Sequence, residues 1–140
     1  MRKSHAFRSI IFVFGAIVLS QVIMCTDYAY QHKVSGNVID TEGQPVQGAI
    51  VRRVLDWENR TQYGLPSLYE RKTDENGNFE FHHKGMGSKP KPREIWYLIV
   101  NHPDYEELQV SIEVQWQEPV DSNFGYIKEG IKLTLTRKGS

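Results

Sequence analysis

The segment VSGNVIDTEGQPVQGAIV, residues 34–51, decides the fold because it has the pattern of two strands joined by a tight turn. Val34 and Val38 fall on one face of an extended chain, whose side chains alternate between two faces. The DTEG sequence at residues 40–43 is typical of a turn, and Pro45 lacks the N–H group that a central strand would donate. The segment therefore predicts a β-hairpin.

The rest of the chain repeats this pattern of strands and turns. The sequence IWYLIV at residues 95–100 is apolar on both faces, as expected of a central strand. Residues 108–116 alternate strictly between apolar and polar side chains, which predicts a half-buried strand, and residues 131–136 alternate in the same way. We expect no helix after the N-terminal apolar segment. These patterns predict an all-β domain over residues 34–138, a seven-stranded antiparallel Greek-key β-sandwich.

Three short motifs resemble the carboxypeptidase regulatory-like domain, which has a transthyretin-like (prealbumin-like) fold. They are the segment at residues 34–51, the TDENGNF sequence at residues 73–79 and the HPDY sequence at residues 102–105. The matching positions lie in turns and in the core, so the resemblance implies a fold and carries no catalytic chemistry. Similar domains occur on carboxypeptidases and on outer-membrane transporters, where they help folding or mediate contacts.

A second resemblance raises the alternative of an enzyme. Hydroxyisourate hydrolases share the transthyretin-like fold, open with a His-Val-Leu-Asp-Thr strand and end in Tyr-Arg-Gly-Ser. The corresponding segments here are Asn37-Val-Ile-Asp-Thr41 and Arg137-Lys-Gly-Ser140. Asn37 stands where that family has a histidine, and an amide does not act as a general base near neutral pH. We see no Ser/His/Asp or Cys/His pattern either, so we expect no enzymatic activity.

Residues 1–25 have the pattern of a secretory signal. Three basic residues lie before or near the start of an apolar run at residues 10–19, whose length is typical of export signals. A retained membrane anchor is the alternative, although the run is short of the roughly 17–25 residues that a membrane span needs. We therefore predict an exported, periplasmic protein in which residues 26–33 form a short tether to the domain.

The only cysteine, Cys25, lies at the end of this segment. The sequence VIMC at residues 22–25 resembles a bacterial lipobox, in which the cysteine is lipidated and attaches the protein to a membrane. Met24 departs from that motif, because the residue before the cysteine is usually small. The alternative is that Cys25 is the last apolar residue of a signal cleaved after Ser20 or slightly later. A single cysteine excludes an internal disulfide, so stability must come from the core.

The charge balance argues against nucleic acid as a partner. The whole chain has 17 basic and 17 acidic side chains, but its first 25 residues contain three basic and no acidic ones. The remaining residues carry 14 basic and 17 acidic side chains and lack a basic footprint for nucleic acid. We expect the partner to be a protein or a polysaccharide of the cell envelope.

The segment at residues 56–70 interrupts the strand pattern and is the candidate binding loop. It carries Trp57, Arg60, Tyr63 and Tyr69. Aromatic side chains on a loop of a rigid scaffold are typical of a binding site. The alternative is that the loop folds back and caps one end of the sandwich, because a loop of this length needs its own packing.

The sequence predicts no metal and no cofactor. Asp74, Asn76 and Asn78 alternate like the first ligands of a calcium loop, but Gly85 occupies the twelfth position, where an acidic ligand is needed. His82 and His83 are neighbours on an expected strand and point to opposite faces, so they do not share an ion.

Overall fold

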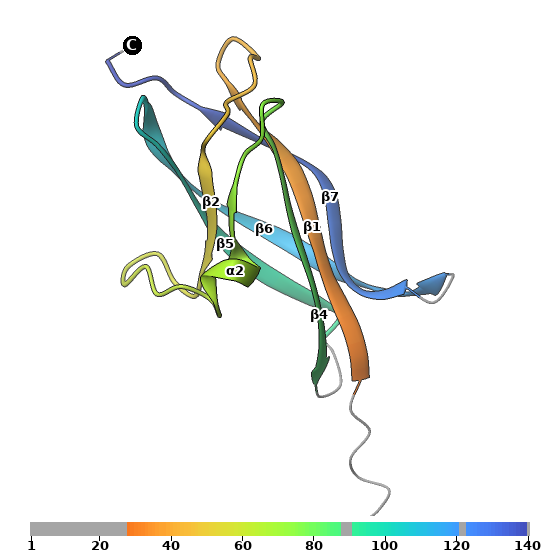
Figure 1. Cartoon of the computed structure of the whole chain (residues 1–140). Helices are drawn as coiled ribbons and strands as arrows, with labels where there is room; N and C mark the ends of the chain where they lie inside the picture. The colour runs from red at the N-terminus through yellow and green to blue at the C-terminus, as the bar shows by residue number, and fades with distance from the viewer. Residues whose placement is uncertain (1–27, 88–90, 121–122, 140) are drawn as a thin grey trace, which may run out of the picture.

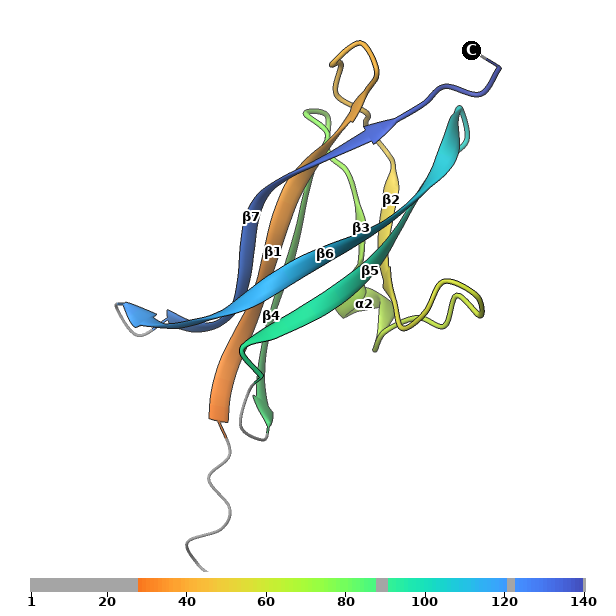
Figure 2. The same ribbon diagram turned by 180° about the vertical axis from the view of Figure 1, so that it is seen from behind.

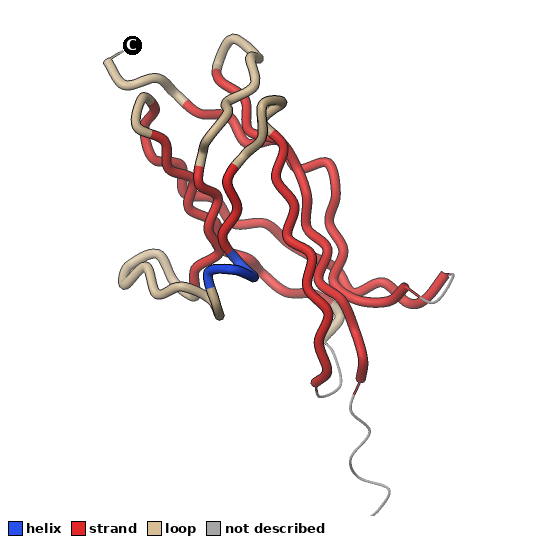
Figure 3. Tube along the Cα trace, in the orientation of Figure 1, coloured by secondary structure: helices blue, strands red, loops and turns tan. Residues whose placement is uncertain are grey.

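The computed structural model describes residues 28–87, 91–120 and 123–139, and this part of the chain is almost entirely β-structure (Figures 1 and 3). Its strands, in chain order, are β1 (Tyr28–Asp40), β2 (Ile50–Val54), β3 (Glu70–Lys72), β4 (Asn78–Gly87), β5 (Arg93–His102), β6 (Tyr105–Val120) and β7 (Asn123–Leu135). A helix of one turn, α2 (Pro66–Tyr69), precedes β3. The prediction of an all-β domain is confirmed, apart from this short helix.

The strands form one mixed sheet in the order β3-β2-β5-β6-β7-β1-β4. Neighbouring strands are antiparallel except β1 and β7, which are parallel. The predicted purely antiparallel arrangement is therefore wrong at this pair. Alternating patterns identify strands but not their neighbours. Here the last strand, β7, lies beside the first strand, β1, and runs in the same direction.

The segment at residues 34–51 makes the predicted turn but not the predicted hairpin. The carboxylate of Asp40 accepts hydrogen bonds from the backbone N–H groups of Glu42 and Gln44, at 2.9 and 2.8 Å, which closes the turn. After the turn, Val46 still donates to the backbone oxygen of Val38. The chain then crosses to the other part of the sheet, where β2 pairs with β3 and β5 rather than with β1.

The first strand is longer than the sequence predicts. The prediction of a tether over residues 26–33 is wrong for residues 28–33, which pair with β4, while residues 31–33 also pair with β7. The physical reason lies at His32, which is polar yet points inward and is only 4% exposed. An inward-facing histidine breaks the apolar alternation by which a strand is recognised in a sequence.

The sheet curls into an almost barrel-like shape, so that its two edge strands, β3 and β4, lie close together (Figures 1 and 2). Arg71 of β3 bridges these edges. Its Nε donates to the backbone oxygen of Glu80 at 2.7 Å, and its Nη1 donates to the backbone oxygens of Ser67 and Glu70. This side chain occupies a strand edge that would otherwise offer its carbonyl groups to another chain.

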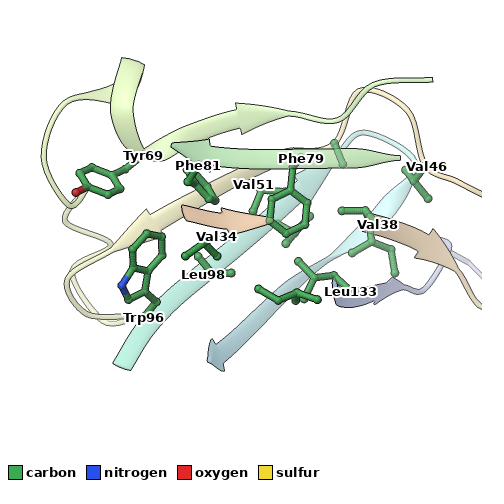
Figure 4. Packing of buried hydrophobic residues seen from close by; sticks show 14 of the residues in the cluster. Val34, Val38, Val46, Val51, Tyr69, Phe79, Phe81, Trp96, Leu98 and Leu133 are labelled. Atoms are coloured by element: carbon green, nitrogen blue, oxygen red, sulfur yellow. The ribbon is translucent and has the colours of Figure 1, made fainter. Parts of the chain in front are cut away.

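The core fills the inner face of the curled sheet (Figure 4). Val34 and Val38 of β1 are fully buried, as the alternation in the sequence predicts. They share the core with Phe81 of β4 and with Trp96 and Leu98 of β5, and the rings of Phe81 and Trp96 pack edge to face with centroids 5.8 Å apart. These buried side chains supply the stability that the chain cannot obtain from a disulfide.

The predicted signal segment, including Cys25, lies outside the described residues. Among the residues that the structure does describe, none belongs to a helix long and apolar enough to cross a membrane.

Candidate functional site

The candidate binding loop separates into two parts that point to opposite faces of the sheet. Trp57 and Arg60 lie over the outer face of β5 and β6. Trp57 packs edge to face against Tyr97, with ring centroids 5.1 Å apart, and Arg60 pairs with Glu107. Trp57 remains 37% exposed, so binding through this part of the loop stays a prediction.

Tyr63 and Tyr69 point instead toward the interior. Tyr69, at the end of α2, is 5% exposed and belongs to the core, and the ring of Tyr63 packs edge to face on it at 4.8 Å. Tyr69 is therefore packed into the core rather than presented on the surface. The four predicted residues do not converge on one surface, because the helical turn at Pro66 directs the end of the loop back under the sheet.

Tyr63 and Tyr69 lie beside a buried arginine, the centre of a cluster at one end of the core. The guanidinium carbon of Arg53 is 3.5 Å from the ring centroid of Tyr63 and 3.9 Å from that of Trp96, so the cation is held between two aromatic faces. Its Nη2 lies 3.4 Å from Oε2 of Glu94. Burial lowers the pKa of Arg53 and the charge of Glu94 opposes this shift, but a guanidinium remains charged.

Glu94 connects the arginine to the other polar groups of this cluster. Its Oε2 accepts a hydrogen bond from the indole N–H of Trp96 at 3.1 Å and lies 3.5 Å from Nε2 of His32, which is long for a hydrogen bond. Burial acts to raise the pKa of Glu94, but the contact with His32, the Trp96 bond and the charge of Arg53 outweigh it and hold the pKa below its usual value.

The last member of the cluster is Tyr69. Its hydroxyl is 3.1 Å from Nδ1 of His32, and burial raises its pKa to about 12, so it stays neutral. We call the set His32, Arg53, Tyr63, Tyr69, Glu94 and Trp96 the interior cluster. Its charges and hydrogen-bonding groups mostly bind one another, although Nη1 of Arg53 and Nε2 of His32 have no hydrogen-bond partner in the described part of the chain.

This cluster is not predicted from the sequence, although the sequence contains one signal for it. Arg53 falls on the same face of its strand as Val51, and an arginine on an apolar strand face must find a partner inside the protein. That partner, Glu94, lies at the start of a strand far along the chain, and no sequence spacing joins the two.

A second candidate is a groove of about 570 Å³ on the outer face of β1 and β4. It is lined by Ser35, Gly36, Asn37, Asp74, Asn78, Phe79, Glu80 and Gly130. None of the four residues of the candidate loop takes part in it. Asn37, the residue that occupies the histidine position of the hydrolase resemblance, does.

The groove offers hydrogen-bonding groups that are not engaged elsewhere. The side chains of Ser35, Asn37 and Glu80 make no hydrogen bond within the described residues, while the carboxylate of Asp74 accepts the backbone N–H groups of Asn76 and Asn78. The groove contains no histidine or cysteine. The described part of the chain also holds no group of three histidine, cysteine or acidic residues placed to bind a metal ion.

The chain is similar to one family model and, in its fold, to several solved structures. Residues 34–98 match a family model described as a domain of unknown function (DUF6795). A search of curated proteins gave no match.

The similar solved structures include dioxygenases. They include 3-chlorocatechol 1,2-dioxygenase from Rhodococcus opacus 1CP, with a TM-score of 0.53, 15% identity and coverage of 79% of this chain and 61% of that chain. A mutant catechol 1,2-dioxygenase from Acinetobacter radioresistens gives a TM-score of 0.53 and 13% identity over 80% of this chain and 53% of that chain. Hydroxyquinol 1,2-dioxygenase from Pseudomonas putida DLL-E4 gives a TM-score of 0.51 and 12% identity over 78% of this chain and 57% of that chain.

This chain therefore spans little more than half the length of these dioxygenases. At such low identity the likeness extends to the fold alone.

Proposed function

We propose that the protein is a non-catalytic, exported module of the bacterial cell envelope that binds or scaffolds a protein or polysaccharide partner. In this proposal the β-domain is a carboxypeptidase regulatory-like domain with the Greek-key connections of the transthyretin-like fold. The motifs at residues 34–51, 73–79 and 102–105 support that family, and the all-β architecture is compatible with it.

The groove on β1 and β4 is the observation that carries the proposal. It is concave, it opens on a sheet face made of two paired strands, and three of its polar side chains have no hydrogen-bond partner among the residues that the structure describes. Unengaged polar groups on a rigid backbone suit recognition, since a ligand can bind them without breaking an internal hydrogen bond and without ordering the backbone.

The alternative is a hydrolase related to hydroxyisourate hydrolases. Asn37 lines the groove at the position where that family has a histidine, and its amide does not take up a proton near neutral pH. The titratable groups of the interior cluster are held by one another rather than directed into the groove. Both observations favour binding over catalysis.

Export is the second part of the proposal, and it depends on residues 1–25. Cleavage at Cys25 with lipidation would fix the module to a membrane, whereas cleavage elsewhere would release it into the periplasm. We favour an envelope location in either case, because the apolar run has the length of a signal.

Intact-mass measurement of the protein from membrane and soluble fractions of its native host tests the export. We expect a mature chain that has lost the signal, beginning either at acylated Cys25 or at an unmodified residue near it. Affinity capture from detergent-solubilised envelopes and from purified cell-wall polysaccharide then tests the binding. A full-length protein in the cytosol that retains no envelope component would overturn the proposal.

A further inference from the structure

The groove contains a regular array of polar side chains on two paired strands. Ser35 lies directly opposite Glu80, and Asn37 lies directly opposite Asn78, in the antiparallel pairing of β1 and β4. The two pairs are two residues apart along each strand, so all four side chains share the outer face of the sheet. We call these four residues the polar array.

The spacing of the polar array follows from β geometry. Directly opposed side chains stand about 5 Å apart across two strands, and residues two apart on a strand stand roughly 7 Å apart along it. The four groups therefore form a rectangle about the width of a sugar ring. Hydroxyl and amide groups at its corners both donate and accept hydrogen bonds, as the hydroxyl groups of a sugar do.

A bulge with a glycine keeps one side of the array open. The pairing of β1 with β7 shifts between Val34 and Gly36, which leaves Glu129 and Gly130 of β7 as a bulge beside the array. Gly130 has φ of 71° and lines the groove without a side chain. Lys33, next to the array, is turned to Glu129 by an ion pair of 2.7 Å.

The charges in the groove select the kind of ligand. Its lining holds two carboxylates, Asp74 and Glu80, and no cationic side chain, which disfavours an anion. Oδ1 of Asp74 is engaged by its own turn and Oδ2 has only a 3.5 Å contact with Asn78, whereas the carboxylate of Glu80 accepts no hydrogen bond within the described residues. Phe79, the one aromatic residue of the lining, is only 4% exposed, so the groove presents no exposed aromatic ring to a ligand.

We propose that the polar array is a binding subsite for an uncharged saccharide unit. Asn37 and Asn78 each present an amide that donates and accepts, Ser35 adds a hydroxyl, and Glu80 accepts from a sugar hydroxyl. This inference rests on the proposed function and specifies its ligand class and its site. It makes no use of the candidate loop.

The test is a titration of the purified full-length protein with chitohexaose, cellohexaose and maltohexaose, followed by NMR of the asparagine side-chain amides. Cosedimentation with purified peptidoglycan sacculi covers insoluble glycans. We expect at least one of these glycans to bind and to shift the amide signals of Asn37 and Asn78. The double variant Asn37→Ala/Asn78→Ala should bind at least about tenfold more weakly, since it loses two hydrogen-bonding side chains.

A matched control is Gln109→Ala/Ser111→Ala, which removes two exposed polar side chains from the outer face of β6 and should leave binding unchanged. If the Asn37→Ala/Asn78→Ala variant does not fold, the nearly isosteric Asn37→Asp replaces it and should weaken binding in the same direction.

Three outcomes would overturn the inference. If none of the glycans binds, the proposed ligand class is wrong. If the double variant binds as tightly as the wild type, the proposed site is wrong. A lysine-rich peptide that binds the array when no glycan does would reassign the groove to a protein partner. That third result would leave the proposed binding function standing, whereas absence of any envelope partner in the capture experiment would not.

Discussion

The interior cluster and the polar array are two collections of polar side chains in one small sheet, and they differ in what those side chains bind. In the interior cluster, Arg53 is 5% exposed and bonds with Glu94, and His32 bonds with Tyr69. In the array, Asn37 has no such partner within the described residues. Buried polar groups must be satisfied internally or they cost stability, whereas exposed ones are satisfied by water and remain available to a ligand. From this difference we infer a folding role for the first group and propose recognition for the second.

The largest expected effect comes from breaking the interior cluster at its centre. Arg53→Ala should destabilise the fold by about 3–5 kcal/mol, because it leaves Glu94 partly buried without its cationic partner and empties the space between two aromatic rings. Urea unfolding at neutral pH measures this. The paired variant Arg53→Met/Glu94→Gln removes both charges together and should cost clearly less. If the two variants unfold alike, packing rather than charge pairing explains the cluster.

A second variant tests the close approach of β1 to the bulge of β7. A Cβ atom added at Gly36 would lie 2.2 Å from the backbone oxygen of Ile131, and a backbone atom cannot move aside as a flexible side chain does. Gly36→Ala should therefore cost about 1–3 kcal/mol in thermal or urea unfolding. The control is Gly43→Ala, at a turn where φ is 81° and an added Cβ would meet no atom within 4 Å. This control measures the strain of a positive φ alone, whereas Gly36→Ala measures steric overlap.

The interior cluster should also make stability depend on pH. The pKa of Glu94 in the folded protein lies below its ordinary value of 4.5. Its stabilising contribution is therefore complete above that ordinary value and is lost as the pH falls through the lower, folded-state pKa. Glu94→Gln should be less stable than the wild type at neutral pH and should lose stability less steeply below pH 4.5. If the free energy of unfolding changes with pH in the same way for Glu94→Gln and the wild type, protonation of Glu94 is not coupled to folding.

The sequence predicted the strands far better than their arrangement or the polar groups between them. Alternation places Val34 and Val38 in the core, because it reports the period of a strand. It says nothing about neighbours, which explains the unpredicted parallel pair β1–β7 and the absence of a β1–β2 hairpin.

The same limit applies to the candidate site. Asn37 and Asn78 face each other only because β1 pairs with β4, although they lie far apart in the chain. The loop was recognisable as an insertion, yet the inward turn of Tyr69 depends on α2, whose four residues are too few to show helical periodicity. Pairing across a sheet and packing beneath it are both long-range events that one strand's sequence does not record.

A smaller effect is expected where the candidate loop lies on the outer face. Trp57→Ala removes an edge-to-face contact with Tyr97 and should lower stability by about 0.5–1.5 kcal/mol. If Trp57 is instead a binding residue, as the sequence predicts, the variant should lose a partner captured from envelopes. Trp57→Phe keeps an aromatic ring and is the matched control, since it should retain most of the stability and much of any binding.

The smallest effect on folding is expected at the polar array, and it sharpens the comparison most directly. Asn37→Ala/Asn78→Ala should change the free energy of unfolding by no more than about 0.5 kcal/mol, since both side chains lie on the outer face and only a 3.5 Å contact from Asn78 to Asp74 is lost. Urea unfolding beside Arg53→Ala measures the contrast. A loss near that of Arg53→Ala would mean that the amides support the fold. The polar array would then belong with the interior cluster, and its unengaged groups would no longer indicate recognition.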